Sequence, residues 1–202
     1  MTEPVHILHP SLWEKLVIAN PRDVCTRSGA TFDDVTGSYI LNFLQERYRI
    51  CPHTQEFEAL AGTHTSRDPS IELKVGLITY LLNAKEIALV GKLITGNSLK
   101  GGKTFFQGTH SFPIEPLVEL YGQDQEGFLA KGLTLGATRA SFGDVSLHFL
   151  VLPRVPVIMV LWVADEEFPA RLNVLFDASI DKHLPLDSIY GLVSEICHRM
   201  KG

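Results

Sequence analysis

Residues 145–176 have the sequence VSLHFLVLPRVPVIMVLWVADEEFPARLNVLF. In the first part apolar residues alternate with Ser146 and His148, which is typical of a strand with one buried face. Residues 157–163 are apolar at every position, as in a central strand, and the alternation returns at residues 172–176. Because the two connecting segments are short, we predict an antiparallel meander of three strands.

The rest of the chain changes between helical and strand periodicity. Asn20 is a preferred N-cap residue, Pro21 a preferred first helical residue and Gly29 a preferred helix end, so one helix is predicted between them. Ser11 and Glu14 form a capping-box pattern for a helix before it, ending near residue 19. The other predicted helices span about residues 68–83, 113–121, 125–133 and 185–200. The other predicted strands span residues 31–35, 38–44, 47–51 and 87–94.

Runs of strands that alternate with helix pairs predict an α+β fold. We expect mixed, largely antiparallel sheets, with the meander near the C-terminus, packed against helices. No stretch rich in Pro, Gly or Ser suggests a linker, so residues 1–202 are predicted to form a single domain. A chain of this length can bury a sizeable core.

Composition excludes several functional classes. The chain carries 18 Lys and Arg against 23 Asp and Glu, a formal net charge of −5, so it lacks the basic surface typical of nucleic-acid binding. Cys25, Cys51 and Cys197 form no CxxC pair, as is usual in a reducing cytosol. The first sixteen residues are too polar for a signal peptide, and the apolar stretch 155–164 is too short to cross a membrane. We therefore expect a cytoplasmic protein with no nucleic-acid or membrane partner.

Three motifs of known chemistry are either absent or have the wrong spacing. Residues 102–104 (GKT) resemble the end of a phosphate-binding P-loop, but the glycine expected at position 97 is an asparagine. Residues 96–101 resemble the nucleophile turn of a serine hydrolase with one residue too many. No HExxH pattern occurs, and the neighbouring Cys51 and His53 do not fill a tetrahedral site by themselves, so no metal site is predicted.

The glycine-rich loop predicted over residues 96–108, with His110 beyond it, is the first candidate site. Glycines let a backbone approach a ligand closely, and exposed N–H groups beside lysines favour an anion. The alternative is a structural loop in which Phe105 and Phe106 fill the core. The candidate ligand-binding residues here are Gly101, Gly102, Lys103 and His110.

The second candidate group surrounds the meander. Asp144 could orient His110 or His148, or form an ion pair with Arg139. Alternatively, residues 143–144 form a plain turn and Arg139 lies on the surface. Trp162 lies in a strand that is apolar on both faces, so it either belongs to the core or stacks on a ligand. The candidate ligand-binding residues here are Arg139, Asp144 and Trp162.

Several of these positions carry a family resemblance. The motif positions are residues 101–106 with His110, Gly143-Asp144, Leu152-Pro153 with Pro156, and Trp162 with residues 165–170. They resemble the domain of unknown function numbered 3786, found largely in anaerobic bacteria and archaea, and the likeness extends from Trp13 to the C-terminal helix. The resemblance implies no established activity, but it implies a setting in anaerobic cofactor or one-carbon metabolism. Some relatives carry a cysteine-rich four-iron cluster module, which three scattered cysteines cannot supply.

Three hypotheses follow. In the first, an accessory protein binds a small molecule or cofactor, an anionic or amphipathic ligand, with hydrogen bonds from His110 and Asp144. The resemblance suggests a tetrapyrrole such as a corrinoid, with His110 as the nearest axial ligand. In the second, an enzyme uses His110 as general base and Asp144 to fix its tautomer, both as catalytic residues. In the third, the acidic surface docks an iron–sulfur or corrinoid protein partner. The first two require His110 and Asp144 to line one cavity.

Overall fold

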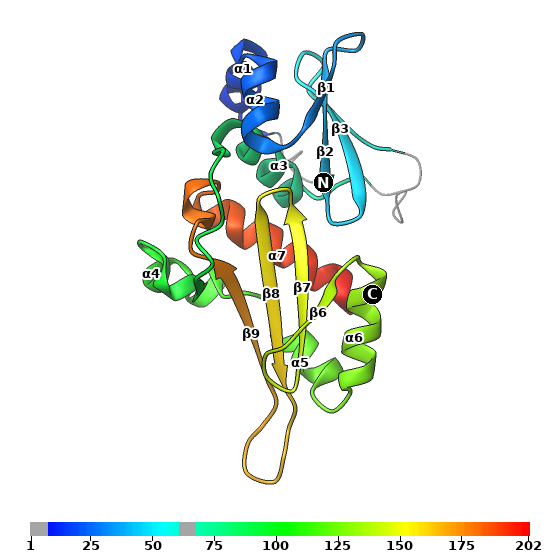
Figure 1. The fold of residues 1–202 in the computed structure, drawn as a ribbon, viewed down its shortest axis with the longest axis vertical. Coiled ribbons are helices and arrows are strands. Elements are labelled where there is room, and N and C mark those ends of the chain that lie inside the picture. The colour runs from blue at the N-terminus through cyan, green and yellow to red at the C-terminus, as the bar shows by residue number, and fades with distance from the viewer. Residues whose placement is uncertain (1–7, 61–67) are drawn as a thin grey trace, which may run out of the picture.

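Two antiparallel sheets, one above the other in Figure 1, form the framework on which the helices pack. The computed structural model describes residues 8–60 and 68–202. The first seven residues, which belong to the stretch considered for a signal peptide, lie outside the described residues. The predicted α+β class with largely antiparallel sheets is confirmed.

The smaller sheet has four strands in the order β1-β2-β3-β4, each antiparallel to the next. They are β1 (Thr31–Asp33), β2 (Ser38–Phe43), β3 (Glu46–Cys51) and β4 (Glu56–Ala59). Helices α1 (Pro10–Ile18) and α2 (Pro21–Ser28) precede it. Strands β1 to β3 were predicted, whereas β4 was not. In β4, Glu56 and Glu58 are exposed, and Phe57 and Ala59 are half-buried. Four residues are too few to show a period in the sequence.

The larger sheet has five strands in the order β5-β9-β8-β7-β6, all antiparallel. Strands β7 (Val145–Leu152), β8 (Val155–Trp162) and β9 (Arg171–Asp177) form the predicted meander. The short strands β5 (Leu93–Thr95) and β6 (Thr138–Ala140) pair with its two edges. Helices α5 (Glu115–Tyr121) and α6 (Gln125–Thr134) contact this sheet through β9 and β7, respectively.

Helix α7 (Leu186–Lys201) runs behind the larger sheet in Figure 1 and packs on α3 (Ile71–Asn83). The predicted apolar stripe of α7 is buried, with Ile189, Leu192 and Ile196 at most 2% exposed. A Cβ atom on Gly76 of α3 would lie 2.8 Å from Leu192 Cδ2, so this glycine permits the close approach of the two helices. The main hydrophobic core therefore extends from the smaller sheet across α3 and α7 to the larger sheet.

Helix starts follow local capping chemistry. The helix after Asn20 is confirmed, because the Asn20 side chain accepts from two backbone N–H groups and Gly29 ends the helix with φ of +72°. The capping-box prediction at Ser11 is wrong: the N-cap is His9, two residues earlier, and its Nδ1 accepts from the Ser11 N–H. Ser70 caps α3, so that helix starts at Ile71, later than predicted.

The region between α3 and α5 differs most from the prediction. The strand predicted over residues 87–94 pairs only at Leu93–Thr95, and residues 84–92 form neither helix nor strand. The loop predicted after it contains two 3₁₀ turns, η1 (Gly96–Ser98) and η2 (Gly108–His110), and the short helix α4 (Gly102–Phe105). A further 3₁₀ turn, η3 (Ile180–Lys182), precedes α7. An apolar, β-prone stretch does not by itself show whether a partner strand exists.

A buried group of charged side chains joins the smaller sheet to α7. Arg199 of α7 lies 2.6 Å from a Glu46 oxygen of β3 and 2.8 Å from a Glu195 oxygen. Its guanidinium also lies over the Phe43 ring and donates to the Tyr48 hydroxyl, which donates to Glu46. Burial, followed by the hydrogen bond to Glu46, raises the pKa of Tyr48 to about 12, so this hydroxyl stays a donor near neutral pH.

Candidate functional site

The glycine-rich segment, residues 96–110, packs against α7 through aromatic rings. Phe106 is buried, and its ring centroid lies 4.7 Å from that of Phe112. His110 is exposed, and its ring lies 4.7 Å from the Phe105 ring and 5.5 Å from the Tyr190 ring of α7. Phenylalanine rings therefore occupy space beneath this segment, as in the structural alternative.

The glycines of this segment are required by the conformation and close packing of its own backbone. A Cβ atom on Gly102 would lie 2.0 Å from the Gly96 carbonyl oxygen, so the turn η1 and helix α4 can approach only over a glycine. Gly101 has φ of +77°, a left-handed conformation that other residues rarely adopt. The neighbouring Lys103 is exposed and forms no ion pair within the described part of the chain.

Replacement of Gly102 by alanine is therefore expected to lower the free energy of unfolding by about 2 kcal/mol, because the added methyl group meets backbone rather than a movable side chain. Urea unfolding followed by circular dichroism measures the change. Lys103→Ala, one residue further in the same short helix, is the matched control and is expected to change it by less than about 0.5 kcal/mol. Equal values for the two variants would contradict this account of Gly102.

Asp144 and Trp162 lie together in a second place, a cavity of about 460 Å³ that we call the Trp162 cavity. It lies where β8 ends and β9 begins. Its lining residues are Asp144, Trp162, Val163, Asp165, Phe168, Pro169, Ala170 and Arg171. Trp162 and Arg171 are directly opposed in the strand pairing, and the guanidinium carbon lies 4.5 Å from the centroid of the half-buried indole. The cavity therefore has an aromatic wall with a cation stacked on it.

Two carboxylates shape the rim of the Trp162 cavity. Asp144 Oδ2 accepts from the Val163 N–H at 2.9 Å, which fixes the carboxylate beside the indole strand. Asp165 Oδ1 accepts from the N–H groups of Glu167 and Phe168, and these hydrogen bonds lower the pKa of Asp165. The resulting turn leaves Phe168 65% exposed. The rim thus offers negative charge and an apolar ring side by side.

The structure brings together only part of the predicted set. His110 is not among the residues that line the Trp162 cavity, because β8 and β9 lie between the turn of Asp144 and the glycine-rich segment. Arg139 is exposed in β6 and faces Leu147 in the strand pairing. The expected pairing of His110 with Asp144 in one cavity is therefore not observed, and neither is an ion pair between Arg139 and Asp144 within the described residues.

Sequence reasoning did not single out Arg171, and it included Phe168 only within the family motif at residues 165–170. Arg171 is the first residue of β9, and a hairpin register that pairs the end of β8 with the start of β9 places it beside Trp162. Pairing of the end of β8 with the start of β9 is therefore the feature that could have pointed to Arg171. For Phe168 the sequence gives a weaker indication, an aromatic residue in an otherwise acidic turn.

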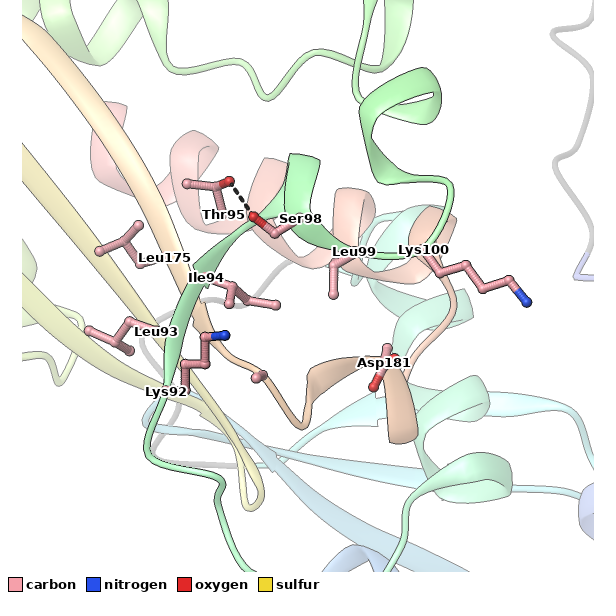
Figure 2. A pocket seen from close by; sticks show the side chains of 10 residues that line it. Lys92, Leu93, Ile94, Thr95, Ser98, Leu99, Lys100, Leu175 and Asp181 are labelled. Carbon is pink, nitrogen blue, oxygen red and sulfur yellow. Dashed lines mark hydrogen bonds between the residues drawn. The ribbon is translucent and has the colours of Figure 1, made fainter.

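A larger hollow of about 560 Å³ adjoins the glycine-rich segment and is drawn in Figure 2; we call it the Lys92 cavity. The hydroxyl groups of Thr95 and Ser98 lie 3.3 Å apart on one side of it, and leucine and isoleucine side chains line its interior. Figure 2 shows Lys100 extending away from the other lining side chains. The cavity is open and its charged groups, including Lys92 and Asp181, do not converge on one point.

Asp177 anchors the chain just before Lys92, one of the residues that line the Lys92 cavity. Its buried carboxylate accepts from the N–H groups of Val90 and Gly91, at 3.0 and 2.7 Å, and from the N–H and hydroxyl of Ser179. Burial by itself would raise the pKa of Asp177, yet the hydrogen bonds outweigh it and the pKa lies below its ordinary value. This side chain therefore has a structural role.

Residues 8–60 and 68–202 contain no group of three or more His, Cys, Asp or Glu side chains that could hold a metal ion. Cys25, Cys51 and Cys197 are free thiols, and burial raises the pKa of Cys25 and raises that of Cys197 to about 12. Among the helices of the described part, none is both long and apolar enough to cross a membrane.

These features define an α+β protein with two antiparallel sheets and a ligand-sized cavity at the end of its meander. The family model described as Domain of unknown function (DUF3786) matches residues 20–199, and the chain belongs to that family. The match confirms the resemblance inferred from the motif positions and assigns no activity. No curated protein matches the chain, and no solved structure matches it.

Proposed function

We propose that this protein is a binding protein for a small amphipathic anion, held in the Trp162 cavity. The observation that carries the proposal is the Arg171 guanidinium stacked on the Trp162 indole beside the exposed Phe168 ring. Arg171 has no carboxylate within 4.0 Å in the described part of the chain, so its N–H groups are available to a ligand. Guanidinium groups bind carboxylates and phosphates through paired hydrogen bonds.

The other lining groups define the remainder of the ligand. Phe168 and the neighbouring Pro169 offer an apolar surface, which fits a flat or hydrophobic body. Asp144 uses Oδ2 for the Val163 N–H, which leaves Oδ1 to accept from a ligand donor. A molecule with a carboxylate or phosphate, a ring and one hydrogen-bond donor meets all three requirements.

A titration of the purified protein tests the proposal. The probes are aromatic carboxylates, nucleoside phosphates, cobalamin and haem, of which the last two cover the tetrapyrrole suggested by the family resemblance. Trp13 is 2% exposed, so a ligand-dependent change in tryptophan fluorescence is expected to come from Trp162 and to disappear in Trp162→Phe. Calorimetry gives the affinity without optical interference from coloured ligands.

Arg171→Gln is expected to weaken binding about 10- to 100-fold, because it removes a charge-assisted hydrogen bond. Arg139→Gln is the matched control: it removes an exposed arginine of the same sheet that lies outside the cavity, and binding is expected to stay unchanged. His110→Ala is expected to leave binding unchanged as well. The proposal fails when no class of probe binds, or when Arg171→Gln binds as tightly as the wild type.

A second candidate function is the docking of a protein partner, of the iron–sulfur or corrinoid class suggested by the resemblance. The observation in its favour is the loop between β8 and β9, which extends beyond the rest of the molecule in Figure 1 and carries the exposed Phe168 next to three acidic residues. Exposed aromatic residues are common anchors of protein interfaces. An acid–base role for His110 with Asp144 receives no such support, because the two residues do not share the cavity.

A further inference from the structure

Opposite charges line the Trp162 cavity without neutralising each other. Its charged lining groups are the carboxylates of Asp144 and Asp165 and the guanidinium of Arg171. None of the three forms an ion pair within the described part of the chain. Hydrogen bonds from backbone N–H groups of its own turn lower the pKa of Asp165, so this carboxylate is ionised near neutral pH. A ligand with negative charge alone pairs with Arg171 but is repelled by the carboxylates.

The backbone places the opposite charges on the two sides of the indole. The Asp144 N–H donates to the Leu161 carbonyl, and the Asp144 side chain accepts from the Val163 N–H, so Asp144 lies against Trp162 from the side of β7. Arg171 is paired with Trp162 from the side of β9. Neighbouring strands lie about 4.8 Å apart, so the backbones of Asp144 and Arg171 are about 10 Å apart. One small molecule can therefore reach both charged groups.

We infer that the ligand of the Trp162 cavity is a zwitterion, an amino acid with an aromatic or large apolar side chain. The inference rests on the proposed function and names the class of its ligand: the hydrogen-bond donor that meets Asp144 is a charged ammonium group. The carboxylate of the ligand pairs with the Arg171 guanidinium. The ammonium group donates to Asp144 Oδ1, the oxygen that the Val163 N–H does not occupy.

The apolar lining determines which side chain the amino acid carries. Arg171 covers one face of the indole, with its guanidinium carbon 4.5 Å from the ring centroid, so that face is closed to a ligand. Phe168 is 65% exposed, and Pro169 is its neighbour in the lining. An aromatic or large apolar side chain packs on these two residues. The volume of about 460 Å³ lies in the range of small-molecule sites.

Calorimetry with three compounds that share one phenyl ring tests the inference on the full-length protein. Phenylalanine carries both charged groups, hydrocinnamate lacks the ammonium group, and phenethylamine lacks the carboxylate. The wild type is expected to bind phenylalanine at least about tenfold more tightly than either of the others, because phenylalanine alone engages both Asp144 and Arg171.

Asp144→Asn distinguishes a zwitterion site from a plain anion site. The variant removes one negative charge and keeps a side-chain oxygen for the Val163 N–H. It is expected to bind phenylalanine about tenfold more weakly than the wild type, because the ammonium group loses its ion pair. It is expected to bind hydrocinnamate about two- to threefold more tightly, because a repelling charge is gone.

Glu166→Gln is the matched control. It removes an exposed carboxylate of the β8–β9 loop that does not line the cavity, and solvent screens its charge, so both affinities are expected to stay within about twofold of the wild type. Circular dichroism checks that both variants are folded.

The outcomes separate this inference from the proposed function. A wild type that binds hydrocinnamate as tightly as phenylalanine overturns the inference and leaves the proposed anion site in place. An Asp144→Asn variant that weakens both compounds alike, or that binds phenylalanine as the wild type does, also overturns it. When neither compound binds, the inference fails, and the proposed function fails with it only when the other classes of probe do not bind either.

Discussion

Arg199→Leu is expected to lower the free energy of unfolding by about 3–5 kcal/mol, the largest effect of any substitution considered for this protein. The guanidinium is 10% exposed and faces Glu46, which is 4% exposed, and Glu195, which is 13% exposed. Its removal takes away a cation beside one buried and one largely buried carboxylate, and it also removes the donor to the Tyr48 hydroxyl. Urea unfolding followed by circular dichroism measures the loss.

The control for this prediction is Arg49→Leu in β3, the strand that also carries Glu46 and Tyr48. Arg49 pairs with Glu58 across β3 and β4, and the two side chains are 30% and 58% exposed. Solvent screens such a pair, so its loss is expected to cost about 1 kcal/mol or less. Similar losses for the two arginines would show that the buried group of charges does not join the smaller sheet to α7 in the way described.

Asp177→Ala is expected to lower the free energy of unfolding by about 3 kcal/mol, because three N–H groups and one hydroxyl lose their buried, charged acceptor. The variant is also expected to release residues 90 and 91 from the body of the protein. Hydrogen exchange at these two amides reports that release directly, and urea unfolding gives the global loss.

Asp181→Ala, an exposed aspartate four residues further along, is the matched control and is expected to change stability by less than about 0.5 kcal/mol. The wild type should show a related dependence on pH. The pKa of Asp177 lies below that of the unfolded chain, so its contribution is complete above the unfolded value and is lost as the pH falls through the folded one. A variant as acid-sensitive as the wild type would argue against Asp177 as the source.

Local chemistry explains which parts of the fold could be predicted. Asn20, Pro21 and Gly29 act within one helix, and the alternation in residues 145–176 reflects one sheet face, so both predictions are confirmed. The short strands β4 and β6 contain four and three residues, too few for a period, and their pairing depends on a neighbouring strand. Residues 86–92 have the composition of a strand, but they pair with no strand among residues 8–60 and 68–202.

The candidate site was harder to predict than the fold, because it depends on where the tertiary structure places residues that are distant in the sequence. Asp144 and Trp162 lie in one cavity because the β7–β8 hairpin brings the start of one strand to the end of the next, and residues 144 and 163 are joined by a hydrogen bond. His110 follows a different path, since its position depends on aromatic packing against α7. No periodicity in the sequence reports that packing, and the hypothesis of a joint His110–Asp144 site could not have been decided from the sequence.

The position of α7 has a consequence for the order in which this chain folds. The hydrogen bond from Ser70 to Glu195 joins residues 125 positions apart, and that from Arg199 to Tyr48 joins residues 151 positions apart. Hairpins such as β7–β8 close only short loops, so they form early, whereas docking of α7 must wait until the entropy of closing these long loops is repaid. We therefore expect the last helix to dock late in folding and its docking to limit the folding rate.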